Sequence, residues 1–345
     1  MSYIFQTCLL ISTLSGNQQC TDSEILSRFE FQEVHMGVQW RIVLYATDKA
    51  IANKAAQNAF SRVKELNKIL SDYDPESELN KLCRLSGPGK PIPVSPTLLT
   101  VLKNSQALSQ ETNGAFDVTI SPVVRLWRRA RRKKAMPTSQ RLQEARSKVG
   151  YKLMKISQKN QTVELLKNEM RLDLGGIAKG YAADIALNVL KKNGVPRAMV
   201  DASGDIVLGD PPPGKCGWKI GIASSDDPKA NQDRYLLLHN MAVATSGDAL
   251  QHVDLDGKRY SHIVDPRTGL GLTDQSRVTV IAPDGTTADS LASAISVLGP
   301  EQGIKLLNQK PSTACLILRH EARHQDRQIV SYESHCFSCY ELKQN

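Results

Sequence analysis

The sequence predicts an α+β protein that folds as a single compact domain, with mixed and antiparallel sheets and interspersed helices. Strand-like segments occur in runs, and helices do not alternate with them as in a doubly wound sheet. The chain has 345 residues, of which 41% are hydrophobic, which is enough for a full core. We see neither an internal repeat nor a long linker. We therefore expect a domain over residues 33–320, a leader or flexible arm over 1–32 and an unassigned polar tail over 321–345.

Five segments have the spacing of apolar residues that is typical of helices. The first is followed by Asp74-Pro75, which disfavours further helix. The fourth ends at Gly194 with Pro196 beyond it, and the fifth ends at Gly299-Pro300. The expected helices cover residues 48–70, 96–112, 138–149, 178–193 and 286–298.

The expected strands are shorter. Residues 38–46 alternate well enough for a strand, and a turn at Lys159-Asn160 predicts a hairpin between 151–156 and 162–166. Asp173 is expected to end the next strand. The remaining strands are expected at residues 198–201, 206–208, 218–223, 235–238, 241–245, 277–282 and 313–318.

The formal net charge of +9 suits an anionic ligand or surface without identifying one. Much of it comes from one run that includes Arg125 and six cations between Arg128 and Lys134. A solvated face, a membrane surface and an acidic partner are all compatible with the run. Nucleic acid is disfavoured, because no aromatic residue for base stacking lies between Arg128 and Lys134. Since the cations repel one another, we expect them to lie exposed and away from the turn at residues 173–179.

Seven cysteines are present, an odd and scattered number that is not a disulfide framework. Cys336 and Cys339 form a C-x-x-C pair, which is either accidental or a zinc or redox site. No segment is long enough to span a membrane. A short apolar run at residues 8–11 and Cys20 suggest a degraded export signal, but no Lys or Arg precedes the run, so the leader alone does not establish export.

The most informative segment runs from Asp173 to Asp184, with the sequence DLGGIAKGYAAD. An acid, two glycines and the start of a helix with Lys179 in its first turn follow one another. Small residues let a ligand approach the backbone, and the free N–H groups of a helix start favour phosphates. The pattern is neither G-x-G-x-x-G nor a P-loop. It indicates a nucleotide site or, alternatively, a purely structural turn.

Asp289 and Ser293 are four residues apart on an expected helix, so they share one face. A carboxylate and a hydroxyl that reach one point suit Mg²⁺, which completes its octahedron with water and phosphate oxygens. The alternative is a helix cap or a solvated face.

Three further side chains could carry chemistry, although each could also be structural. His262 can accept a proton near neutral pH. Tyr73 and Phe116 offer planar apolar surface to an aromatic ligand, and Asp117 could accept a hydrogen bond from a ring N–H.

Several segments accompany the 173–184 turn in a characteristic order. They are Ser71-Asp72-Tyr73-Asp74-Pro75, Gly114-Ala115-Phe116-Asp117, Ala244-Thr245-Ser246-Gly247-Asp248, Tyr260-Ser261-His262-Ile263-Val264-Asp265-Pro266-Arg267-Thr268-Gly269 and Ala288-Asp289-Ser290-Leu291-Ala292-Ser293-Ala294. In this order and spacing they closely resemble the ApbE family, the FAD:protein FMN transferases. The resemblance runs from about residue 35 to about residue 319.

The resemblance implies roles for individual residues. It implies that Mg²⁺ binds to Asp289, to the hydroxyl of Ser293, where the family usually has threonine, and to a backbone carbonyl of the Gly175-Gly176 turn, assigned to Gly176. It implies that His262 lies at the active site, where we expect it and Lys179 to be catalytic. Thr245, Ser246 and Asp248 are expected to shape the site between metal and flavin. The residues expected at the FAD site are Met36, Tyr73, Ala115, Phe116, Asp117, Asp173 and Lys179. Asn113 stands where the family commonly has glycine, and Cys83 where it commonly has asparagine.

The implied activity is the Mg²⁺-dependent transfer of the FMN part of FAD to a Thr or Ser hydroxyl of an acceptor flavoprotein, with release of AMP. One rival is an Mg²⁺-dependent FAD pyrophosphatase, in which water replaces the acceptor. The other is a flavin-binding carrier without turnover, against which Asp289, Ser293, His262 and Lys179 argue. Many relatives are exported, so the resemblance also implies a location in the cell envelope or on its periplasmic side, with a cytoplasmic location as the alternative.

Overall fold

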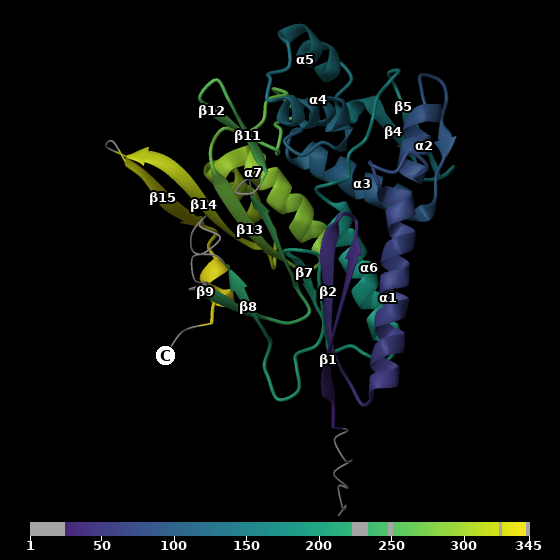
Figure 1. The fold of residues 1–345 in the computed structure, drawn as a ribbon, viewed down its shortest axis with the longest axis vertical. Helices are drawn as coiled ribbons and strands as arrows, with labels where there is room; N and C mark the ends of the chain where they lie inside the picture. Colours follow the sequence, from purple (N-terminus) through teal and green to yellow (C-terminus); the bar gives the residue numbers. More distant parts are fainter. Residues whose placement is uncertain (1–24, 223–233, 248–250, 324–325, 343–345) are drawn as a thin grey trace, which may run out of the picture.

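The centre of the molecule is an eight-stranded sheet in which all neighbouring strands are antiparallel (Figure 1). The computed structural model describes residues 25–222, 234–247, 251–323 and 326–342. In spatial order the strands are β1 (Ser27–His35), β2 (Val38–Ala46), β6 (Ala198–Asp201), β7 (Asp205–Leu208), β10 (Ala242–Gly247), β13 (Ser276–Ala282), β14 (Ala314–Arg323) and β15 (Asp326–Glu333).

Three long helices cover one face of this sheet (Figure 1). They are α1 (Lys49–Leu70), α6 (Ala178–Lys192) and α7 (Gly285–Leu307). β2 shows why the face is buried, because Trp40, Ile42 and Leu44 alternate toward the helices and join their core. Asp48 caps α1 by accepting a hydrogen bond from the Ile51 N–H at 2.9 Å. α7 is broken at Gly299, whose φ is 78°, so the expected stop at Gly299-Pro300 is a kink and a second segment continues to Leu307.

The opposite face of the sheet is covered by a hairpin and by the C-terminal residues. The hairpin consists of β8 (Trp218–Ile222) and β9 (Arg234–Leu238), and a 3₁₀ turn, η3, covers Phe337–Tyr340. Phe337 is fully buried there in a second core, together with Val43 from the other side of β2. The tail therefore packs against the sheet, and the predicted boundaries at residues 32 and 320 fall inside β1 and β14.

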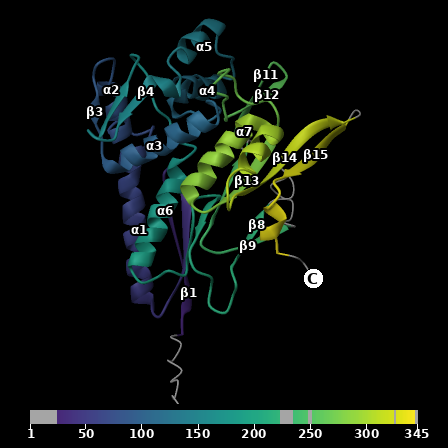
Figure 2. The same ribbon diagram turned by 180° about the vertical axis from the view of Figure 1, so that it is seen from behind.

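A smaller group of elements lies at one end of the sheet and helices, at the top in Figure 1 and again in the rear view of Figure 2. It contains four helices, two short sheets and two 3₁₀ turns among the described residues. They are α2 (Glu78–Leu85), α3 (Pro96–Glu111), α4 (Ser121–Lys133), α5 (Ser139–Arg146), β3 (Ile92–Pro93), β4 (Met154–Ser157), β5 (Thr162–Leu165), β11 (His252–Leu255), β12 (Lys258–Ser261), η1 (Val118–Ile120) and η2 (Tyr151–Leu153). A third core, which includes Trp127, Val253 and Leu255, joins α4 to the β11–β12 hairpin.

The expected fold class is confirmed, and most elements lie within a few residues of their expected bounds. Two of the expected strands were wrong. The strand expected at 151–156 begins as the 3₁₀ turn η2, and only Met154–Ser157 pairs with a neighbour. Residues 166–172, directly before Asp173, form no strand. Helix α4, which contains the basic run up to Lys133, was not among the expected helices. Val123, Trp127 and Ala130 give it a buried face. No helix among the described residues has both the length and the apolar character needed to cross a membrane.

Candidate active site

Hydrogen bonds to the 3₁₀ turn η1 and to helix α2 hold the turn at the start of α6. The Asp173 N–H donates to the Val118 carbonyl at 2.8 Å, and the Leu172 N–H donates to Cys83 Sγ at 3.3 Å. Because these backbone N–H groups already have partners in η1 and α2, residues 170–174 do not join a sheet. The Asp173 carboxylate accepts from the Gly175 N–H at 2.8 Å, which shapes the turn.

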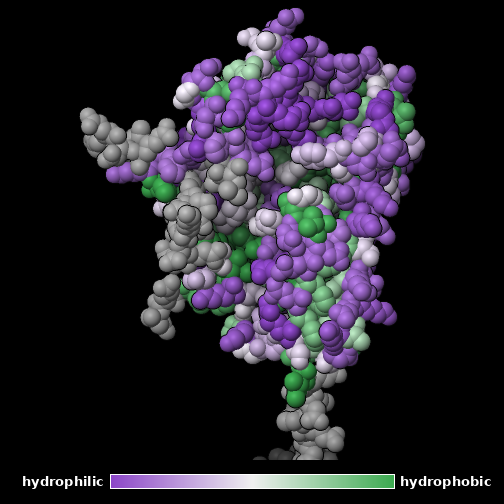
Figure 3. Space-filling view, in the orientation of Figure 1, coloured by the Kyte–Doolittle hydropathy of each residue, from purple (hydrophilic) through white to green (hydrophobic). Residues whose placement is uncertain are grey.

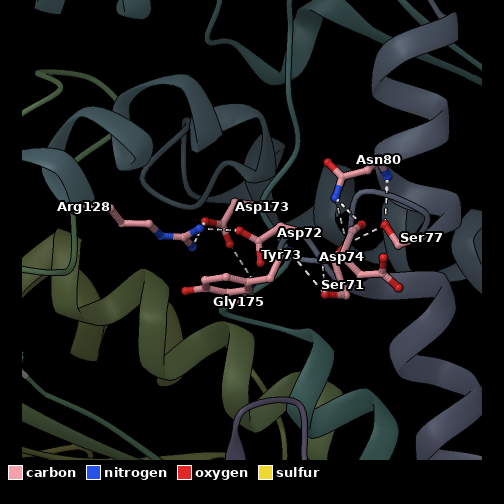
Figure 4. Close-up of polar contacts among 9 residues, drawn as sticks. All are labelled: Ser71, Asp72, Tyr73, Asp74, Ser77, Asn80, Arg128, Asp173 and Gly175. Carbon is pink, nitrogen blue, oxygen red and sulfur yellow. Dashed lines mark hydrogen bonds and ion pairs between the residues drawn. The ribbon is translucent and has the colours of Figure 1, made fainter.

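Arg128 ties this turn to the segment between α1 and α2 (Figure 4). Its guanidinium lies 2.6 Å from Asp72 and 2.9 Å from Asp173, and it stacks 4.4 Å above the ring of Tyr73. Burial and the neighbouring Asp72 carboxylate raise the pKa of Asp173 to about 6. The expectation that the whole basic run lies away from the turn was therefore wrong for Arg128, since two carboxylates offset the cost of its burial.

The three residues expected to bind metal come from α7 and from the turn before α6. A methyl group placed on Gly176 would lie 2.7 Å from the Ser293 hydroxyl, so these two residues are in direct contact. Asp289 is one turn earlier on α7, is 5% exposed, and accepts a hydrogen bond from the Gly180 N–H at 3.0 Å. The structure brings Gly176, Asp289 and Ser293 together at the start of α6.

The donor set fits a hard cation. Carboxylate, hydroxyl and carbonyl oxygens are the ligands that Mg²⁺ takes, together with water and phosphate. Burial raises the pKa of Asp289, and a bound cation would favour its ionised form. Within the described ranges, Ser293 Oγ makes no hydrogen bond to protein. No group of three or more His, Cys, Asp and Glu side chains suited to a metal occurs in that part of the chain, so a cation here would depend on substrate and water for further ligands.

Lys179 has an acidic partner that the sequence analysis missed. Its ammonium group forms a close ion pair with Asp205, which is 3% exposed at the start of β7. Asp205, Asp289 and Asp201 together raise the pKa of Lys179, so it stays charged. The available signal was an acid before three apolar residues of a buried strand, Asp205-Ile-Val-Leu, which is a costly position unless the acid is paired.

Burial lowers the pKa of His262, and the positive charges of Arg131 and Lys179 lower it further. The Nδ1 atom of His262 is 3.1 Å from the Gln251 carbonyl oxygen, which can only accept a hydrogen bond. We therefore assign the single N–H of the neutral imidazole to Nδ1, which leaves Nε2 unprotonated and able to accept a proton.

The residues expected to meet the flavin are at different depths. Phe116 is 7% exposed and would lie 3.4 Å from a methyl group on Gly176, whereas Tyr73 is 75% exposed. Ala115 is buried beside Phe116. Both oxygens of Asp117 accept from protein donors, one from Thr119 and one from the Tyr151 N–H at 2.7 Å. Asp117 therefore shapes the loop that carries Phe116.

Two further sets of expected residues lie in or next to the central sheet. Met36 occupies the β1–β2 turn with a φ of 50° and packs against the main core. Thr245 contacts Thr279 across β10 and β13, with 3.1 Å between their hydroxyl oxygens, and Ser246 follows it in β10. Asp248 lies outside the described residues.

Together, the fold and site define an α+β protein in which a glycine turn at the start of a helix lies beside the carboxylate of Asp289 and the hydroxyl of Ser293. Residues 36–317 match the ApbE family model, and the chain belongs to the ApbE family. It is 30% identical to the FAD:protein FMN transferase of Vibrio cholerae over 288 residues, which cover 82% of this chain and 85% of that protein. It is 28% identical to the FAD:protein FMN transferase of Treponema pallidum, with 91% of each chain covered.

Solved structures agree with these sequence matches. The flavin transferase ApbE from Vibrio cholerae superposes with a TM-score of 0.80 at 28% identity, covering 92% of this chain and all of that one. The ApbE protein of Thermotoga maritima superposes with a TM-score of 0.79 at 30% identity, with the same coverage.

Proposed function

We propose that this protein transfers the FMN part of FAD to a Thr or Ser hydroxyl of an acceptor flavoprotein and releases AMP. The observation that carries the proposal is the convergence of Gly176, Lys179, Asp289 and Ser293 where α6 begins. A phosphate group at this point would meet a lysine, the start of a helix and the oxygen ligands of a cation. Membership of the ApbE family agrees with this chemistry.

In the transfer step, the acceptor oxygen attacks the phosphorus on the FMN side of the pyrophosphate. A new P–O bond forms, the bond to the bridging oxygen breaks, and AMP leaves with that oxygen. His262 Nε2 takes the hydroxyl proton, for which its neutral form is suited. Lys179 stabilises negative charge on the phosphates, and Asp205 holds it in place.

We assign Mg²⁺ to Asp289, Ser293 and the carbonyl of Gly176, where it would neutralise pyrophosphate charge. On the other side of the turn, Arg128 holds Asp173 and Tyr73 in the positions proposed to meet FAD. Phe116, backed by Asp117, offers an apolar surface beside Gly176.

The test uses a flavoprotein domain that carries FMN on a threonine phosphoester, purified without its flavin. With FAD and Mg²⁺, the acceptor mass should rise by one FMN unit, and AMP should appear in equal amount. Release of FMN and AMP without acceptor labelling would instead identify a pyrophosphatase. Tight FAD binding with neither product would identify a carrier, and either result would refute the proposed transfer.

We also propose that the protein acts in the cell envelope, which rests on the family resemblance. Fractionation of cells that express the full chain with a C-terminal tag tests this, and recovery only in the cytoplasmic fraction would refute it. Association of the basic face of α4 with a membrane surface is an alternative to an acidic protein partner, and vesicle binding separates the two.

A further inference from the structure

A large basic hollow lies between α2, α4, α5 and the segment that leads to the Asp173 turn. Its volume is about 1070 Å³. Seven cationic and two acidic side chains line it, a net formal charge of +5. Figure 1 places α2, α4 and α5 together at one end of the molecule, and Figure 3 shows strongly hydrophilic residues gathered over that end. No residue that lines the hollow has a role in the transfer step described above.

Most of its cations lack an acidic partner. Both carboxylates, Glu144 and Glu169, form ion pairs with Lys148, whose Nζ atom lies 3.3 Å from Glu144 and 2.5 Å from Glu169. Arg84 lies 3.6 Å from Glu76, which is outside the hollow. Within the described ranges, five lining cations have no carboxylate within ion-pair distance: Lys90, Arg125, Arg129, Arg141 and Arg171. Like charges kept together without partners are unfavourable in the free protein, so the hollow is suited to an anionic ligand.

The lining narrows the class of ligand. It contains no Phe, Tyr, Trp or His, so it offers no surface on which nucleic acid bases could stack. A hollow also matches a flat lipid surface poorly, whereas an extended peptide can enter it. The forked guanidinium groups of Arg125 and Arg129, one helical turn apart on α4, match carboxylates in pairs.

The hollow is also close to the site of transfer. Its wall includes Met170 and Arg171, which directly precede the Asp173 turn, and Cys83, which holds that turn through the Leu172 N–H. α4 contributes Arg125 and Arg129 to the hollow and Arg128 to the ion pair with Asp173. A partner bound in the hollow would therefore lie beside the loop proposed to hold FAD.

We propose that this basic hollow binds an acidic segment of the acceptor protein and so brings the acceptor hydroxyl to the bound FAD. The inference rests on the proposed function for the identity of the partner. The binding itself needs neither FAD nor a metal.

The experiment compares two charge-reversed proteins of equal net charge. The hollow variant carries Arg125→Glu and Arg129→Glu, and the control variant carries Arg132→Glu and Lys133→Glu. All four residues are exposed on α4, and only the first two line the hollow. Binding of a fluorescein-labelled peptide of five Glu-Gly repeats is measured by anisotropy, with a Gln-Gly peptide as the neutral control. The hollow variant should bind the acidic peptide at least roughly tenfold more weakly, and the control variant should stay near the wild type at physiological salt.

Several outcomes would overturn the proposal. They are no binding by the wild type, equal losses in both variants, and a loss of FAD affinity in the hollow variant. Tighter hollow-dependent binding of phosphatidylglycerol vesicles or of a ten-nucleotide oligothymidylate would assign the hollow to a membrane or to nucleic acid. Absence of FMN transfer by the wild type would refute the proposed function and leave the peptide result standing. If transfer occurs, the hollow variant should raise the KM for the acceptor and leave kcat unchanged.

Discussion

At the scale of single residues, the site depends on glycines, which have no side chain, as well as on residues whose side chains take part in the chemistry. A methyl group on Gly180 would lie 2.0 Å from the Gly285 carbonyl oxygen, so only glycine lets α6 and α7 approach this closely. That approach places Asp289 against the start of α6. Asn113 has a left-handed φ of 49°, which explains how it can occupy a position where the family commonly has glycine.

Asp289 is the one anionic residue that we assign to the metal. Replacing it with Ala should lower FMN transfer by at least roughly a hundredfold, because a metal that neutralises phosphate charge contributes several kcal/mol. AMP release measured against Mg²⁺ concentration checks this, with circular dichroism to confirm the fold. Ser293→Ala should raise the Mg²⁺ requirement, and Ser293→Thr should not. Wild-type activity of Asp289→Ala at ordinary Mg²⁺ concentrations would contradict the assignment.

His262 should act as a base in its neutral form. His262→Asn should lower the transfer rate by roughly a hundredfold to ten-thousandfold with little change in FAD affinity. Because the pKa of His262 is lowered, the imidazole is neutral at pH 7 and becomes protonated only as the pH falls below its ordinary pKa of about 6.5. The wild-type rate should therefore fall on the acidic side, and the variant should lack that limb. Equal losses of binding and rate would indicate a structural role.

At the scale of elements, α4 has three faces with different tasks. Val123, Trp127 and Ala130 pack into the third core. Arg128 binds two carboxylates next to the site, and Arg125 and Arg129 line the basic hollow. α4 therefore contributes residues to a core, to the loop proposed to hold FAD and to the basic hollow.

Replacing Arg128 should lower both the stability of the protein and its affinity for FAD. Arg128→Ala leaves Asp72 and Asp173 close together without a cation, and we expect the free energy of unfolding to fall by about 1–3 kcal/mol. FAD affinity should also fall, since Tyr73 and Asp173 lose their support. Arg129→Ala is the matched control, because Arg129 is exposed, and its effect should stay within about 0.5 kcal/mol. Urea unfolding and FAD titration of both variants check this, and equal effects would contradict it.

At the scale of the whole molecule, the two ends of the described chain form the two edges of one sheet. β1 is one edge and β15 the other, and the site lies on the helix-covered side between them. Beyond β15, Phe337 fills the core on the opposite face. The C-terminal residues are thus part of the structure that supports β10 and β13.

Truncating Phe337 should destabilise the protein without touching the chemistry. Phe337→Ala creates a cavity in the second core, and we expect a loss of about 3–5 kcal/mol in the free energy of unfolding. Urea unfolding checks this, and transfer activity at low temperature should remain close to the wild type. Ile329→Ala on β15 is the control, because that side chain is 41% exposed, and its cost should be well below 1 kcal/mol. Equal costs in the two variants would show that the tail does not support the core.

The sequence by itself determined the fold class and the bounds of elements such as β2 and α1, and it placed Asp289 and Ser293 on one face of a helix. These follow from local periodicity, capping and spacing along one helix, or from a family pattern that the chain retains. Only the tertiary structure decided the partners that come from distant parts of the chain. The pairing of Lys179 with Asp205, the burial of Arg128 between Asp72 and Asp173, and the packing of Phe337 under the sheet all depend on which elements meet. The free-energy cost or gain of burying a charge or a ring depends on those neighbours, which are tens to hundreds of residues away in the sequence.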